Sequence, residues 1–425
     1  MDEVRIYKQF DPAPLTPGDN ELYVDLDNVR GETHIVKKFA RRIRLSRNSN
    51  TVQILAGHRG SGKSTELRRL QENLQSENPR YFVVYVEADE DIEGNDVDFP
   101  EVLIAIVRQM ADQLRKRAKI ELKPGYFKDR AYRLKGLLGS EVDFEKVDLG
   151  TGLLKISAAI KNSPDARLEV RRLLEPDTSN WLEAANEVIG QAVTELRRQG
   201  FEGLVIIVDD LDKMILKPHA AGCTTAEYLF IHREAQLRAF NSHMVYTMPI
   251  ALAYSTQEQN IENLYGGRVP VVPMVKIMTR PPDQTRYEDG FEKFRDLVRR
   301  RLSRAGVKAE QVFDSKDTLD QLIELSAGQP RELVILIREA IVSSDLPICK
   351  EAVERAEREG RWAFERQLNG DHWPVIDEVR LKGEFSRTND NDAAIRDLLD
   401  SRALLQYVNA DEWYDVNPMV PKKRP

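Results

Sequence analysis

The residues best suited to chemistry form a glycine-rich stretch from Gly57 to Ser64, with the spacing G-x-x-x-x-G-K-S. This is the signature of a phosphate-binding loop, in which glycines let backbone amides turn inward toward phosphate oxygens. Lys63 is expected to reach the β- and γ-phosphates, and the Ser64 hydroxyl to bind Mg²⁺. The sequence therefore predicts a nucleoside triphosphate site. Its expected contacts are Gly57, His58, Arg59, Gly60, Ser61, Gly62, Lys63, Ser64 and Thr65.

Two adjacent carboxylates form a second group of candidate residues. Asp209 and Asp210 directly follow the apolar stretch 203–208, which is typical of a buried strand. In a phosphoryl-transfer site, Asp209 is expected to hold Mg²⁺, directly or through water, and Asp210 to orient or polarise the attacking water. A polar end to an ordinary strand is the alternative interpretation. The phosphate-binding loop earlier in the chain favours the catalytic one.

The elements around these residues predict how they are positioned. A mostly apolar run, 52–56, precedes the glycine loop, and Leu67, Leu70 and Leu74 give the following segment an amphipathic helical pattern. Further apolar runs at 81–86 and 203–208 alternate with helical segments. Such alternation is typical of a parallel sheet with helices on both faces. The expected fold class is therefore α/β, with a P-loop at the carboxyl end of one strand.

Two stretches depart from this alternation. Residues 1–22 hold several prolines and are expected to form an irregular leader. Within 120–175, Leu154, Ile156 and Ile160 alternate with polar residues after a Gly-Thr-Gly turn, which predicts an inserted β-hairpin. The hairpin is expected either to cover the scaffold or to protrude as a contact element.

Beyond about residue 290 the pattern becomes helical, with expected helices at 291–302, 319–325, 332–342 and 350–367. A later helix near 393–405 precedes an expected small hairpin around the Asn409-Ala410 turn. The predicted domains are 1–22, an irregular leader; 23–285, a P-loop core with the insert; 286–368, a helical lid; and 369–425, a small C-terminal domain.

Over about residues 23–345 the chain resembles AAA+ ATPases, near the origin-recognition and STAND branches. Gly57–Ser64 matches the Walker A motif and Val205–Asp210 the Walker B motif. Gly328-Gln329-Pro330-Arg331 resembles the sensor-2 motif, which implies that Arg331 reaches the γ-phosphate from a helical lid. Thr247 falls where sensor 1 is expected, and Arg30-Gly31-Glu32 resembles a segment of the adenine pocket. The resemblance implies ATP as the ligand.

The chain also departs from the family pattern. The second Walker B acid is usually Glu, whereas this chain has Asp210, which is one methylene shorter and favours slow hydrolysis. Arg268, Arg280, Arg300 and Arg301 are candidates for the arginine finger that a neighbouring subunit supplies in such ATPases. The C-terminal segment resembles a winged helix. Because its acidic residues outnumber its basic ones, a packing or protein-contact role is favoured despite the basic tail 422–424.

Composition narrows the function classes. The chain has 425 residues, 41% hydrophobic and 31% charged, and a net charge of −7, so it is not a general electrostatic binder of nucleic acid. No apolar run reaches membrane-spanning length, and a cytoplasmic protein without a membrane partner is expected. Two distant cysteines match no metal or redox spacing.

Three functions stay open at this point. The first is an ATP-dependent switch or assembly ATPase that forms a homo-oligomer or acts with a protein partner. The second is a DNA-binding initiator or loader, favoured by the basic helix at 37–47. The third is a regulatory ATPase subunit of a defence complex.

Overall fold

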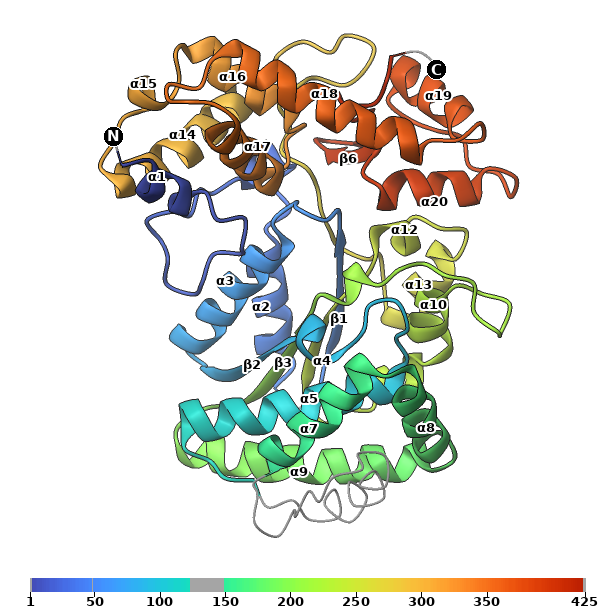
Figure 1. Ribbon diagram of the computed structural model, residues 1–425. Helices are drawn as coiled ribbons and strands as arrows, with labels where there is room; N and C mark the ends of the chain where they lie inside the picture. The colour runs from blue at the N-terminus through green and yellow to red at the C-terminus, as the bar shows by residue number, and fades with distance from the viewer. Residues whose placement is uncertain (1, 48, 123–148, 423–425) are drawn as a thin grey trace.

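A five-stranded parallel sheet forms the centre of the lower part of the molecule in the computed structural model, which describes residues 2–47, 49–122 and 149–422 (Figure 1). The strands run in the order β2-β3-β4-β1-β5, and every neighbouring pair is parallel. Their bounds are β1, Val52–Gly57; β2, Tyr81–Glu87; β3, Gly203–Asp209; β4, His243–Thr247; and β5, Val271–Val272. The predicted α/β fold with a parallel sheet is confirmed.

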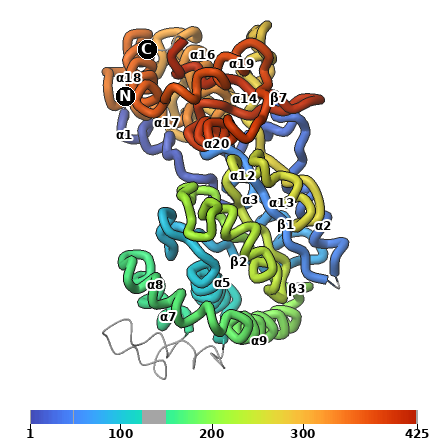
Figure 2. The backbone as a smooth tube through the Cα atoms, turned by 90° about the vertical axis from the view of Figure 1, so that its right-hand side faces the viewer, coloured from blue at the N-terminus to red at the C-terminus, as the bar shows by residue number. Residues whose placement is uncertain are grey.

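Helices cover both faces of this sheet because its strand side chains alternate between them. One face packs Leu55, Val83 and Val205 against the helices α2 (Ile35–Leu45) and α3 (Lys63–Ser76). The other packs the intervening strand residues against a larger set of helices, visible below the sheet in Figures 1 and 2. These are α5, Phe99–Gln113; α7, Leu149–Asn162; α8, Pro164–Leu174; and α9, Thr178–Arg198. The glycine loop thus joins a fully sandwiched strand to a helix.

The predicted β-hairpin at 120–175 is wrong for the residues that the structure describes. Residues 149–162 form helix α7, and residues 123–148 lie outside the described part of the chain. The alternating pattern misled because the apolar residues also fit a helical stripe. Leu153, Ile156 and Ile160 are buried along one face, whereas Leu154 is half exposed.

Short helical segments connect the larger elements. They are η1, Asp27–Val29; α4, Ala88–Asp91; η2, Leu114–Ala118; η4, Glu175–Asp177; η5, Leu211–Lys213; α10, Thr225–Glu227; η6, Tyr228–His232; α11, Glu234–Leu237; α12, Ile250–Ala253; and α13, Glu258–Tyr265. Of these, η5 directly follows β3 and carries the chain across the carboxyl end of the sheet. It therefore lies beside the glycine loop.

A helical layer lies above the carboxyl end of the sheet (Figures 1 and 2). It contains α14, Glu288–Ala305; α15, Ala309–Val312; α16, Lys316–Leu325; α17, Pro330–Ser343; and α18, Lys350–Gln367. Each helix predicted in this region is confirmed. The predicted irregular leader is wrong in part, because residues 3–9 form helix α1. Ile6 and Phe10 are fully buried and anchor α1 against α14 and α17.

The C-terminal segment contains two helices and an antiparallel hairpin. They are α19, Trp373–Lys382; α20, Asp392–Asp400; β6, Leu404–Val408; and β7, Glu412–Val416. The predicted helix and hairpin are confirmed, whereas the winged-helix resemblance stays a prediction. Leu405, Tyr407 and Trp413 of the hairpin pack with Met274 and Ala327. The hairpin is therefore anchored to the connection after β5 and to the end of α16.

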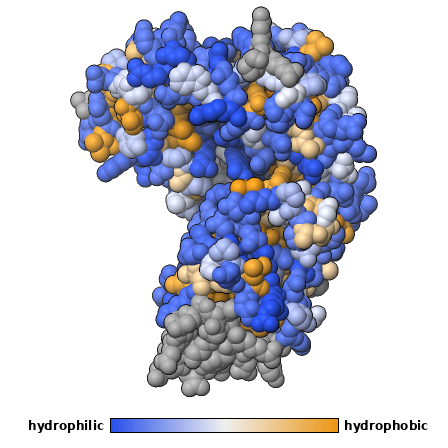
Figure 3. Space-filling model, turned by 45° about the vertical axis from the view of Figure 1, so that its right-hand side comes forward, coloured by the Kyte–Doolittle hydropathy of each residue, from blue (hydrophilic) through white to orange (hydrophobic). Residues whose placement is uncertain are grey.

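Within the described residues, no helix is both long enough and apolar enough to cross a bilayer. Figure 3 shows a face on which hydrophilic residues dominate and the apolar patches are small and separate. The large exposed apolar side chains come from different elements: Val4, Leu45, Leu154, Leu168, Ile215, Val342, Trp362 and Leu381.

Candidate active site

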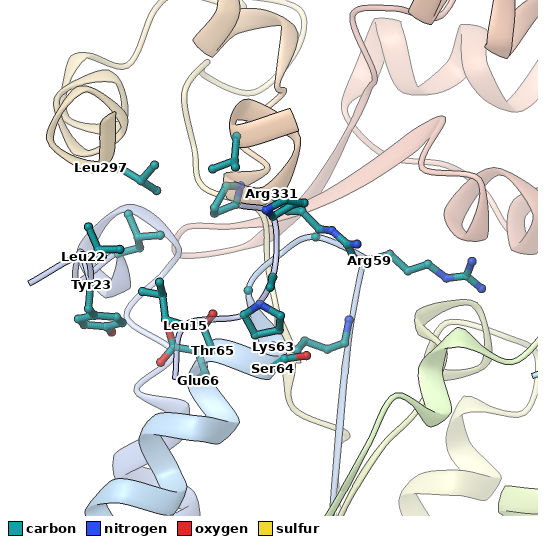
Figure 4. A pocket seen from close by; sticks show the side chains of 18 of the residues that line it. Leu15, Leu22, Tyr23, Arg59, Lys63, Ser64, Thr65, Glu66, Leu297 and Arg331 are labelled. Atoms are coloured by element: carbon teal, nitrogen blue, oxygen red, sulfur yellow. The ribbon is translucent and has the colours of Figure 1, made fainter. Parts of the chain in front are cut away.

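A cavity of about 400 Å³ lies between the glycine loop, the N-terminal segment and the helical layer (Figure 4). Its walls include nine of the predicted site residues: Arg30, Arg59, Gly60, Gly62, Lys63, Ser64, Thr65, Asp210 and Arg331. The other predicted residues do not line it: Gly31, Gly57, His58, Ser61, Asp209 and Thr247. The fold thus brings together side chains from four distant parts of the sequence, as a site between a sheet and a lid requires.

Arg331 reaches the site because α17 begins at the glycine loop. Its backbone amide donates to the Gly60 carbonyl over 3.4 Å. Gly60 has a φ of +89°, and a Cβ placed on it would lie 3.4 Å from the Cβ of Arg331. A side chain at position 60 would therefore be strained by this backbone conformation and would lie in contact with the start of α17. Figure 4 shows Arg331 above the loop, with Lys63 and Ser64 below it.

Lys63 has three acceptors. Its Nζ donates to the carbonyls of Gly57 over 2.7 Å and of His58 over 2.9 Å, and it forms an ion pair with Asp212 at 2.8 Å. Both charged side chains are buried, at 5% and 7% exposure. An ammonium group has three donors, so Lys63 is fully satisfied by these contacts. A phosphate oxygen that binds Lys63 must take the place of one of them.

Asp212 is a functional residue that the sequence analysis did not identify. It lies in η5, three residues after Asp209, and a short helical turn brings its carboxylate back over the strand end. Thr247 fixes this turn, since its buried Oγ1 accepts the Leu211 amide over 3.1 Å. Thr247 thus contacts the acidic segment rather than the cavity. The sequence feature that could have identified Asp212 is its place as the third acidic residue in the run Asp209-Asp210-Leu211-Asp212.

Asp209 lies beneath the glycine loop. Tyr85 of β2 donates to its Oδ2 over 2.6 Å. Burial first, and then the charge of Asp212, raises the pKa of Asp209, while hydrogen bonds from Tyr85 and Ser64 oppose the rise. Tyr85 was also missed, since a buried aromatic residue in a strand is ordinarily read as core.

Asp210 stands at the wall of the cavity. It adopts a φ of +69°, and its carboxylate pairs with Lys213 at 2.7 Å. Burial and the neighbouring Asp209 raise the pKa of Asp210 to about 7. Oxygens of Asp209, Asp210 and Asp212 all lie within 4.8 Å of one another. Carboxylate oxygens beside a serine hydroxyl are the ligands that Mg²⁺ prefers, so these residues fit the predicted metal.

Two predicted adenine-pocket residues lie in different surroundings. Arg30 is 2% exposed and lines the cavity, with its guanidinium 3.7 Å from Glu66. Gly31 instead packs against the hairpin, where a Cβ would lie 2.7 Å from Val408. It therefore shapes the contact with the C-terminal segment rather than the cavity wall.

His58 turns its side chain away from the cavity and into the C-terminal segment. The ring is fully buried between α20 and β6. Its Nδ1 lies 3.2 Å from the Leu399 carbonyl, and its Nε2 accepts the Gln406 amide over 3.0 Å. These partners require the neutral Nδ1–H tautomer, and burial lowers the pKa of His58 to about 3. The glycine loop is thus joined directly to the C-terminal segment.

The end of the cavity away from Lys63 is apolar. Figure 4 shows Leu22, Tyr23 and Leu297 gathered there, opposite Arg331 and Arg59. The wall comes from the N-terminal segment and two lid helices: Pro12, Ala13, Pro14, Leu15, Leu22, Val24, Leu26, Leu297 and Val334. A segment that the sequence analysis treated as a leader therefore forms part of the site. In the sequence, the apolar residues of this segment were the only feature that suggested burial. Hydrophobic periodicity could not predict where they pack, because the segment is irregular.

The four arginines considered as fingers lie in different settings. Arg268 pairs with Glu412, Arg280 donates to the Lys382 carbonyl, and Arg300 donates to the Tyr23 carbonyl. Arg301 lines the cavity of its own chain. Its position therefore argues against a role in a neighbouring subunit's site.

No family model matches the chain, and no curated protein matches it. Among solved structures, it is similar to a Walker-type ATPase of Pyrococcus abyssi, at 14% identity and a TM-score of 0.44, with 97% of each chain covered. It is also similar to the ORC2 protein of Aeropyrum pernix in its ADPNP–ADP complexes, at 13% identity and a TM-score of 0.43, over 97% of this chain and 94% of that one. At this level the likeness assigns no function. The chain's own parallel sheet, with the glycine loop between β1 and α3, gives it a P-loop fold.

Proposed function

We propose that this protein is an ATPase that hydrolyses ATP slowly and acts as a nucleotide-dependent switch, in the manner of the AAA+ proteins that its motifs resemble. One observation carries the proposal. The glycine-loop lysine Lys63, the carboxylates of Asp210 and Asp212, and the lid arginine Arg331 line one cavity whose far end is apolar. A triphosphate matches the charged end, and a flat heteroaromatic base matches the apolar one.

The residues around the cavity suggest a separate role for each in binding the phosphates and in hydrolysis. Lys63 exchanges Asp212 for oxygens of the β- and γ-phosphates, which keeps its buried charge compensated. Asp210 accepts a hydrogen bond from the attacking water and so orients it toward the γ-phosphorus. Ser64 and Asp209 would hold Mg²⁺, which neutralises the charge of the phosphate oxygens when bound.

Arg331 provides the sensing step. It is exposed at the cavity wall, and no hydrogen bond of its guanidinium occurs within the described part of the chain. An arginine in this position gains charge-assisted hydrogen bonds from a γ-phosphate and loses them after hydrolysis. The lid helix α17 is therefore attracted to the site by ATP more than by ADP, which is the differential affinity that a switch requires.

The contact between the glycine loop and the C-terminal segment offers a route by which the nucleotide state is transmitted to the C-terminal segment. His58 bonds to α20 and β6, and the adjacent Arg59 lies 3.6 Å from Asp400. A shift of the loop when phosphates bind therefore changes contacts on the C-terminal segment. A protein partner that recognises this segment would receive the signal.

The test is Lys63→Ala in the full chain, with Lys37→Ala, an exposed lysine of α2, as the matched control. ATP affinity is measured by calorimetry and hydrolysis by phosphate release. We expect Lys63→Ala to weaken ATP binding by about tenfold to a hundredfold, because the charge-assisted hydrogen bond that replaces the Asp212 contact disappears. Normal binding and hydrolysis in this variant would refute the proposal. Arg331→Ala should weaken ATP but leave ADP unchanged, and equal loss of both would rule out the switch.

Duplex DNA is a second candidate ligand, because α2 carries four exposed basic side chains: Lys37, Lys38, Arg41 and Arg42. Phosphate contacts release counterions, so affinity for DNA should fall steeply as salt rises. A salt titration of the wild-type protein against a variant with all four residues changed to Ala decides this. Absence of binding at low salt would eliminate the DNA role and leave the ATPase untouched.

A further inference from the structure

Arg301 is a buried arginine at the apolar end of the cavity. It lies in α14, one helical turn after Leu297, so both side chains project from the same face of that helix. Both line the cavity, and Arg301 is only 6% exposed. Leu297 marks this place in Figure 4, on the side of Leu22 and Tyr23 and away from Lys63.

The guanidinium of Arg301 has no partner within the described residues. Its Nε and Nη1 are buried without a hydrogen bond. Two nearby arginines of α14 do have hydrogen-bond partners: Arg300 donates to the Tyr23 carbonyl, and Arg304 donates to Asp19. Asp19 is the acid whose charge acts on Arg301, and Arg304 already occupies its carboxylate. Burial lowers the pKa of Arg301 to about 10, so the group still carries its charge at neutral pH.

Such an arrangement destabilises the protein on its own. The buried Nε and Nη1 have lost their hydration without gaining a hydrogen bond, and an arginine keeps its charge at neutral pH, so this cost is not relieved by loss of a proton. Surrounding apolar residues offer no compensation. The donors of Arg301 therefore need acceptors that a bound molecule brings into the cavity.

Resting on the proposed ATPase function, we infer that Arg301 reads the nucleoside end of the ligand by donating hydrogen bonds to acceptor atoms on the edge of a purine base. The phosphates are fixed at the other end by Lys63, which leaves the base in the apolar part of the cavity. The ring nitrogens of a purine base accept hydrogen bonds, and guanine also has the acceptor O6 beside its N7. Arg301 is thus a nucleoside-specificity residue.

The experiment uses the full chain with Arg301→Met and the control Arg299→Met, an exposed arginine of the same helix. ATP, GTP and inorganic tripolyphosphate are titrated into each protein by calorimetry. We expect Arg301→Met to weaken the preferred nucleotide by about tenfold to a hundredfold, the value of a hydrogen bond to a charged group. Tripolyphosphate affinity should not change. The ATP and GTP titrations show which base carries the acceptor.

A second readout separates ligand recognition from a structural role. Because methionine removes an uncompensated charge, the nucleotide-free Arg301→Met protein should melt at a higher temperature than the wild type, while the rise that nucleotide induces becomes smaller. Unchanged nucleotide affinity, or an equal loss for tripolyphosphate, would overturn the inference while the ATPase proposal stands. Failure of the wild type to bind both ATP and tripolyphosphate would instead overturn the proposed function, and this inference with it.

Discussion

The buried ring of His58 provides the sharpest test of how the glycine loop is held. Leucine at this position fills a similar volume but bonds to neither the Leu399 carbonyl nor the Gln406 amide. Each buried backbone group left without a partner costs about 1–3 kcal/mol. The Leu399 carbonyl keeps the Arg402 amide as a partner over 3.3 Å, so only the Gln406 amide loses its hydrogen bond. We therefore expect His58→Leu to lower the free energy of unfolding at pH 7.5 by about 1–3 kcal/mol.

The pH dependence of this effect has a definite sign. The pKa of His58 is lowered from 6.5 to about 3, chiefly by burial, with Lys63 and Arg402 adding positive charge nearby. Between these values the unfolded chain binds a proton that the folded protein excludes, so wild-type stability falls as pH decreases from 6.5. At about 1.4 kcal/mol per pH unit, the loss at pH 5.0 is about 2 kcal/mol. His58→Leu lacks this term, so the gap between the two proteins should narrow by that amount.

Urea denaturation of both proteins at pH 7.5 and 5.0 measures the gap, and groups other than His58 cancel in the comparison. His232→Leu, at an exposed histidine, is the control for the substitution itself and should show only a small gap at pH 7.5. A gap for His58→Leu that stays constant between the two pH values would refute the neutral, doubly bonded ring. A gap below 1 kcal/mol at pH 7.5 would refute the anchoring role itself.

Three further predictions concern the cavity and its walls. Asp212→Asn leaves the buried Lys63 without a countercharge, which should destabilise the nucleotide-free protein by about 3–5 kcal/mol. The same change should tighten ATP binding in the absence of Mg²⁺. Thermal melts measure the stability and calorimetry the ATP affinity, and an unchanged ATP affinity would contradict the prediction. Asp210→Asn should bind ATP normally but lose hydrolysis by about a hundredfold or more, as phosphate release will report; wild-type turnover would exclude Asp210 from the chemistry. Ile6→Ala should cost about 2–5 kcal/mol of stability in thermal unfolding, because Ile6 is fully buried under the lid; an effect below 0.5 kcal/mol would mean that α1 is not anchored there.

The sequence predicted the sheet and the phosphate loop because both depend on local patterns. Apolar runs such as 203–208 fit a strand buried on both faces, and the glycine spacing before Lys63 fits one backbone arrangement. Arg331 was also predicted to lie at the loop, through a motif almost 270 residues later. The structure places it in the cavity wall, while its role stays a proposal.

Other features could not be predicted because they depend on long-range packing. Residues 154–160 fit a strand and a helix equally well until their neighbours decide which side chains are buried. The ring of His58 resembles a loop ligand in sequence, but two backbone groups far along the chain fix its direction. Arg301 was considered only as an arginine finger for a neighbouring subunit, because nothing in the sequence distinguishes one buried basic residue of a helix from its exposed neighbours.

The bonds of His58 also bear on how the protein is made. The ribosome must add 341 residues after His58 before Leu399 exists, and 348 before Gln406 does. Domains generally fold as they emerge, so the early sheet can assemble while the glycine loop still lacks its last anchors. Synthesis that stops within the lid helices would release a chain with a sheet but a loosely held phosphate loop. The glycine loop is therefore fully anchored only after the C-terminal segment has been synthesised.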